Sequence, residues 1–136
     1  MNQVTVPSKT AEDLLIGILA VLARDGKTSI RINDRSFHAA FGDALAIFRD
    51  AGGELGDLAK TFYRDVVSKT YEKLEDALIS AEHYGIVKIY NPAFERLEIS
   101  ITPRVAEQFL GDWPSVERSV IEKAAAQFRK RARSHY

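Results

Sequence analysis

Four polar residues at the start of a predicted helix have side chains suited to binding a nucleic acid: Ser68, Lys69, Thr70 and Lys73. Hydroxyl and ammonium groups donate hydrogen bonds to phosphate oxygens and to the edges of bases. The amino terminus of a helix adds a partial positive charge at the same place. The type and position of these residues therefore favour a surface that contacts DNA.

The same helix carries acidic residues that oppose this interpretation. On a helical wheel of about 100° per residue, Glu72 and Asp76 fall on the side of Lys69 and Lys73. An aspartate that faces phosphate has to turn away, pair with a lysine or accept a hydrogen bond from a cytosine amine. An ordinary amphipathic helix with a solvated charged face is the alternative interpretation.

A second basic cluster lies near the end of the chain and comprises Arg129, Lys130, Arg131 and Arg133. These side chains could contact phosphate, in which case added salt would weaken the contact. They could instead form the solvated end of a helix, where cations interact favourably with the helix dipole. The second interpretation needs no ligand and is the one we favour.

Patterns typical of catalysis, metal binding or cofactor binding are missing from the sequence. There is no cysteine, and His38, His83 and His135 are not spaced to place two metal ligands on one helical face. Neither a nucleophile elbow nor a phosphate-cradling glycine loop occurs. We therefore expect a protein without enzymatic activity, bound metal or cofactor.

The composition limits where a nucleic acid could bind. Lysine plus arginine and aspartate plus glutamate both number 19, so the formal net charge is zero and any basic surface must be local. The continuous apolar run over residues 14–23 is shorter than the roughly 20 residues that span a bilayer, and acids rather than a basic leader precede it. With no cysteine present, these features predict a cytoplasmic protein without a membrane segment.

The candidate residues must be positioned by helices and strands, which hydrophobic periodicity predicts. After an arm over residues 1–9, a helix begins at Thr10, which forms a capping-box pattern with Asp13, and ends before Gly26. The other predicted elements are a strand over residues 28–32, a helix over 34–50, a helix over 68–84, strands over 86–89 and 97–101, and helices over 103–110 and 114–133. The first strand would join the later two as the third strand of one sheet.

The stretch over residues 54–67 leaves two interpretations open. Leu58, Phe62 and Val66 keep helical spacing, and Asp57 could cap them. The pattern does not decide whether this stretch is a separate helix or runs unbroken into the helix that begins at Ser68.

Two groups of apolar residues suggest how the helices are buried. The first helix is apolar on nearly every side, so the domain core, alone or together with another subunit, must cover it. On the last helix the predicted buried positions are Val116, Val120, Ala124 and Phe128. We expect a homodimer formed through the first helix, the last helix or both. The aromatic residues could line a ligand pocket, but core packing is their more common use, and this applies to Phe37, Phe41, Phe48, Phe62 and Tyr63.

The central stretch carries a family pattern. Ser68-Lys69-Thr70 opens a helix, Tyr84-Gly85-Ile86-Val87 closes it, and Ile99-Ser100-Ile101-Thr102-Pro103 leads from a turn into the next helix. Over residues 67–110 this order resembles the winged helix-turn-helix regulators of bacteria and archaea, most nearly the multiple-antibiotic-resistance regulator type. Arg104-Val105 replaces the Lys-Gly that usually follows the proline. The spacing departs from the family as well: residues 51–67 are an insertion if the helix from Asp34 is the first of the helix-turn-helix pair, whereas residues 58–62 form the first helix if the preceding one is an added element. The implied fold class is mainly α (α+β), a winged helix with a small β-hairpin wing and a long C-terminal helix.

The resemblance implies a function and a division of the chain. In that family the central helix lies in the major groove, the hairpin tip touches the DNA and the terminal helices dimerise. By position, Ser68, Lys69, Thr70 and Lys73 would contact DNA, with Arg96 near the wing tip. We therefore predict a transcriptional regulator that binds double-stranded DNA, with an arm over residues 1–9, a winged-helix domain over 10–110 and a C-terminal helix over 111–136. The competing hypothesis is an adaptor that holds a protein partner without DNA, as the zero net charge suggests.

Overall fold

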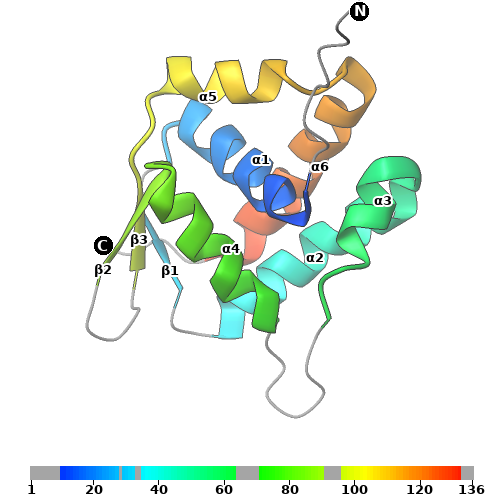
Figure 1. Cartoon of the computed structure of the whole chain (residues 1–136), viewed down its shortest axis with the longest axis horizontal. Helices are drawn as coiled ribbons and strands as arrows, with labels where there is room; N and C mark the ends of the chain where they lie inside the picture. The colour runs from blue at the N-terminus through cyan, green and yellow to red at the C-terminus, as the bar shows by residue number, and fades with distance from the viewer. Residues whose placement is uncertain (1–9, 28, 33–34, 64–70, 91–95, 133–136) are drawn as a thin grey trace, which may run out of the picture.

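The computed structural model describes residues 10–27, 29–32, 35–63, 71–90 and 96–132. These residues form six helices and one three-stranded antiparallel sheet (Figure 1). The mainly α, α+β class expected from the sequence is confirmed. The elements are α1 (Ala11–Arg24), β1 (Ser29–Arg31), α2 (Arg35–Ala51), α3 (Gly53–Ala59), α4 (Glu72–His83), β2 (Val87–Tyr90), β3 (Arg96–Ile99), α5 (Pro103–Gly111) and α6 (Ser115–Arg131).

Helix α1 lies at the centre of the hydrophobic core. It begins with the predicted capping box of Thr10 and Asp13. Every residue from Leu14 to Ala23 except Ile16 is buried, because α3, α4, α5 and α6 all pack against this helix (Figure 1). The chain's own core therefore covers the apolar surface of α1. This corrects the expectation that α1 could serve as a dimer interface.

The sheet has the strand order β1-β3-β2, with both neighbours antiparallel. The strand predicted over residues 28–32 is confirmed as the third strand, because β1 pairs with β3. Side chains alternate along each strand, so that one face of the sheet is buried and the other meets solvent. The buried residues are Ile30, Val87, Ile89, Leu97 and Ile99.

Helix α3 is separate from its neighbours, which answers the question that the sequence pattern left open. Gly52 and Gly53 have positive φ angles of 69° and 59° and divide α3 from α2. Helix α3 ends at Ala59, and the chain is no longer helical at Phe62.

Helix α4 begins at Glu72, four residues later than predicted. Tyr71 precedes it in an extended conformation, with φ −101° and ψ 110°. Its backbone N–H donates to His38 Nδ1 on α2 at 3.0 Å. Tyr71 and Leu74 are both buried, as the periodicity predicted. Tyr71, however, is the N-cap residue of the helix and not part of it. Ser68, Lys69 and Thr70 lie outside the described residues.

The last two helices follow the predicted order with one change in the buried face. Thr102 caps α5 by accepting a hydrogen bond from Val105 N–H at 3.2 Å, and Pro103 occupies the first turn. On α6, Ala124 and Phe128 are buried as predicted, whereas Val116 is 73% exposed. Because a spacing of four residues drifts around a helix of 3.6 residues per turn, the predicted stripe leaves the core at its first position. Ile121 is buried instead.

The aromatic residues confirm the core interpretation, with one exception. Phe37, Phe41, Phe48 and Phe62 are buried, whereas Tyr63 is 76% exposed. Phe41 packs edge-on against Phe62 and Tyr71, with ring centroids 4.8 and 5.7 Å apart. None of the helices in the described part of the chain is long and apolar enough to cross a membrane.

Candidate nucleic-acid interface

Four candidate contact residues gather at one end of the molecule, which we call the hairpin end: Arg31, Lys73, Tyr90 and Arg96. Figure 1 shows that α4 begins at this end and that β2 and β3 approach their connection at the same level. Tyr90 is the last residue of β2, Arg96 the first of β3, and Arg31 the last of β1. Lys73 lies in the first turn of α4.

The turn after α4 creates this arrangement. Gly85 has a φ of 76°, and its N–H donates to Glu82 O at 3.0 Å. Ile86 N–H donates to Ala81 O at 2.9 Å, so the two bonds form a Schellman motif. This tight reversal directs β2 back from the end of α4 towards the level at which the helix begins (Figure 1).

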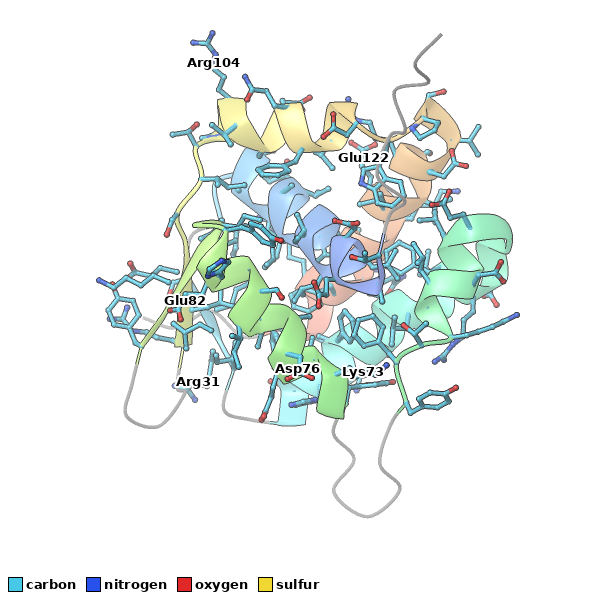
Figure 2. All side chains as sticks on the ribbon, in the orientation of Figure 1. Arg31, Lys73, Asp76, Glu82, Arg104 and Glu122 are labelled. Carbon is cyan, nitrogen blue, oxygen red and sulfur yellow. The ribbon has the colours of Figure 1, made fainter. Side chains whose placement is uncertain are left out.

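Glu82 links the β2–β3 hairpin to α4 through a hydrogen bond. The spacing of residues along the helix did not predict this role. Its carboxylate accepts a hydrogen bond from Ile89 N–H at 2.7 Å. Figure 2 shows the Glu82 side chain on the side of α4 that faces the strands. The carboxylate therefore satisfies a backbone donor of the edge strand β2, in a charge-assisted bond.

Arg96 is the first residue of β3, and its guanidinium already has partners. Arg96 Nη1 donates to Glu98 Oε1 at 2.8 Å, and its Cζ lies 3.9 Å from the centre of the Tyr90 ring. The Tyr90 hydroxyl donates to the other oxygen of Glu98 at 3.0 Å. Lys88 Nζ approaches the same ring at 5.2 Å. Arg96 is thus held by a carboxylate and an aromatic ring.

Lys73 and Asp76 both lie on the solvent side of the first turns of α4 (Figure 2). They also border a groove of about 350 Å³ between α4, the start of α1 and the segment after α3. Within the described ranges neither side chain forms an ion pair. The lysine is therefore available to an anion, while the aspartate places an opposing charge one turn away.

The basic cluster on α6 is largely engaged with carboxylates. Arg131 Nε lies 2.8 Å from Asp43 Oδ2 on α2, and Arg129 Nη1 lies 3.7 Å from Asp25 Oδ2 at the end of α1. Lys130 is exposed and has no ion pair among the residues that the structure describes, and Arg133 lies outside them. Two of the four cations are thus neutralised by acids of the same chain. This pairing agrees with the interpretation of the cluster as a helix end that needs no ligand.

A charged network joins α1, α5 and α6, and the sequence analysis did not predict it. Arg24 at the end of α1 pairs with Glu122 on α6 and lies 3.7 Å from Glu107 on α5. Arg118 Nη2 binds Glu107 at 2.6 Å. The hydrogen bond to Glu122 is the main reason that the pKa of the Arg24 guanidinium is raised above its usual value. Arg24 and Glu122 are 98 residues apart in the sequence, so no local spacing could have revealed their pairing.

The described residues hold no group of three side chains that could bind a metal ion. In comparisons with known proteins, no family model matches this chain. No curated protein and no solved structure matches it either.

Proposed function

We propose that this protein is a winged-helix transcriptional regulator that binds double-stranded DNA with its hairpin end. The observation that carries the proposal is the joint position of α4 and the hairpin. The order of the elements, with β1 completing the sheet, resembles that of a winged helix, except that either α2 or α3 is additional to the helix-turn-helix pair. Lys73 and Arg31 add, at that end, two cations that have no ion pair among the residues the structure describes.

The proposed contact involves the start of α4 rather than its whole length. Lys73 would bind a phosphate or a base edge, together with Ser68, Lys69 and Thr70, which precede α4 in the sequence. Further along α4, Glu75 and Asp76 are exposed, and phosphates would repel them. Dimerisation through the exposed side of α6 stays part of this proposal, because a regulator dimer would match a two-fold symmetric DNA site.

The test replaces Lys69 and Lys73 by alanine and measures the affinity for a DNA duplex at several salt concentrations. The logarithm of the binding constant falls linearly with the logarithm of the salt concentration, and each phosphate contact that is lost makes this slope less steep by about 1. We expect weaker binding and a slope smaller by about 2 in the double variant. Fluorescence anisotropy with a labelled duplex gives both quantities.

The control is Arg104→Ala. Arg104 is an exposed arginine on α5 that has no ion pair among the described residues. This variant should bind as the unchanged chain does. Equal affinity and slope for the Lys69/Lys73 double variant and the control would rule out the start of α4 as the contact surface.

The outward side of α4 favours a second candidate function, a module that binds a protein partner without DNA. Ile79 is 54% exposed and Tyr84, just after the helix, is 72% exposed. Exposed apolar side chains next to Glu75 and Asp76 suit a protein surface better than a phosphate backbone. Recovery of a stoichiometric protein partner that Ile79→Asp abolishes, with no retention on DNA, would favour this function.

A further inference from the structure

We infer that Arg31 on β1, and not Arg96 on the hairpin, is the sheet residue that binds DNA phosphate. The inference rests on the DNA-binding function proposed above and assigns a contact outside both α4 and the wing. The inference follows from how the charged side chains on the solvent face of the sheet are paired.

The register of the sheet brings the two arginines together. Arg31 lies directly opposite Arg96 in the antiparallel pair of β1 and β3, and Arg96 lies opposite Tyr90 in β2. Directly opposite residues point to the same face of a sheet. Arg31, Arg96 and Tyr90 therefore form one row across the solvent face, next to the turn of the hairpin.

The two arginines differ in their partners. Arg96 is bound to Glu98 and stacked on Tyr90. Arg31 is half-buried and makes no side-chain hydrogen bond or ion pair with any residue that the structure describes. Glu98 is the one carboxylate on the described part of this face, and Arg96 and Tyr90 already use both of its oxygens.

This pairing leaves a positive charge that an external anion can neutralise. Like charges directly opposite each other in a sheet are destabilising, and the described residues compensate only one of the two, Arg96. A guanidinium binds phosphate through two parallel hydrogen bonds. A bound phosphate would satisfy the free donors of Arg31 and reduce its repulsion of Arg96.

The position of Arg31 points to a phosphate of the same duplex that Lys73 contacts. Figure 2 shows Arg31 at the hairpin end of the sheet and Lys73 near the start of α4 at the same end of the molecule. Arg104 on α5 extends from the opposite end. A duplex bound at the hairpin end would therefore meet Arg31 and Lys73 but not Arg104.

The experiment compares Arg31→Gln, Arg96→Gln and Arg104→Gln in the full chain, using anisotropy with one labelled duplex over a range of salt. All three changes remove one positive charge, and Arg104 is exposed with no ion pair among the described residues. We expect Arg31→Gln to weaken binding and to lower the salt slope by about 1. Arg104→Gln should change neither quantity, and Arg96→Gln should have a smaller effect than Arg31→Gln.

A thermal melt separates a lost contact from a lost fold. Arg31→Gln removes a cross-strand repulsion, so its melting temperature should equal or exceed that of the unchanged chain. If the unchanged chain binds DNA and Arg31→Gln binds as Arg104→Gln does, the assignment of Arg31 is overturned while the proposed function stands. If the unchanged chain binds no duplex, the proposed function itself fails, and the assignment falls with it.

Discussion

Tyr71 connects the start of α4 to α2 through three contacts of its own. Its backbone N–H is bound by His38, its ring packs edge-on against Phe41, and its hydroxyl lies over Gly42. A Cβ atom at position 42 would lie 2.8 Å from the Tyr71 hydroxyl oxygen. The absence of a side chain at Gly42 therefore makes room for the residue that precedes the proposed contact helix.

Gly42→Ala should consequently destabilise the protein. Alanine is a better helix former than glycine by about 1 kcal/mol, but the added methyl group would force the buried Tyr71 to move. Overpacking of this kind costs about 1–3 kcal/mol, so we expect a net loss of about 1 kcal/mol in the free energy of unfolding, measured in urea.

Two further variants test the cause. Tyr71→Phe removes the hydroxyl that the methyl group would meet, so it should recover most of the stability lost in Gly42→Ala. Gly111→Ala, at the end of α5, places its Cβ where no atom lies within 4 Å and should cause no loss. A Gly42→Ala protein as stable as Gly111→Ala would show that Tyr71 does not lie as described.

At the scale of the elements, the connection between α4 and β2 decides how the hairpin is held. The Schellman motif at Gly85 fixes the turn, and Glu82 binds the backbone of β2 at Ile89. Without this carboxylate, the edge strand would lose the acceptor for one of its N–H groups. The position of β2 relative to the end of α4 therefore depends on this side chain as well as on the turn.

Glu82→Ala should lower the free energy of unfolding by about 1–3 kcal/mol, because it leaves a part-buried N–H without its partner. Hydrogen exchange at the Ile89 amide should also become faster. Glu75→Ala is the matched control, since Glu75 is an exposed glutamate of the same helix with no ion pair among the described residues. If the Ile89 amide of Glu82→Ala exchanged as slowly as that of the unchanged chain, this role of Glu82 would be contradicted.

Local signals explain which elements were predictable from the sequence. Three such signals act within a few residues of a helix end: the capping box of Thr10 and Asp13, the glycine at position 85, and the Thr102-Pro103 pair. The sequence predicted the helix ends that they mark. The start of α4 was not predicted, because Tyr71 fits the apolar spacing of the helix while a contact with His38 holds it extended. The buried face of α6 was likewise set by packing against α1 and α2.

The candidate site was predictable only in part, because some of its features depend on contacts between segments that are distant in the sequence. The exposure of Lys73 follows from its place on the helical wheel, and the position of Arg96 near the hairpin tip follows from the strand pattern. That Arg96 is paired, and that Arg31 lies opposite it, depends on the register between β1 and β3. Strands separated by more than sixty residues leave no spacing from which this register could be read.

At the scale of the whole molecule, zero net charge conceals an uneven distribution. On α1, α5 and α6, arginines such as Arg24 and Arg118 are balanced by nearby glutamates. At the hairpin end, Arg31 and Lys73 remain unpaired within the described residues, and so does Asp76. The proposed DNA contact therefore depends on two separate cations and not on a continuous positive surface.

The most direct test of the central claim, that DNA binds at the hairpin end, is an NMR titration of the ¹⁵N-labelled protein with a DNA duplex. We predict that the backbone amide signals of Arg31, Lys73 and Arg96 shift, whereas those around Arg104 and Glu122 do not. Shifts that cluster on α5 and α6, or no shifts at low salt, would contradict the account.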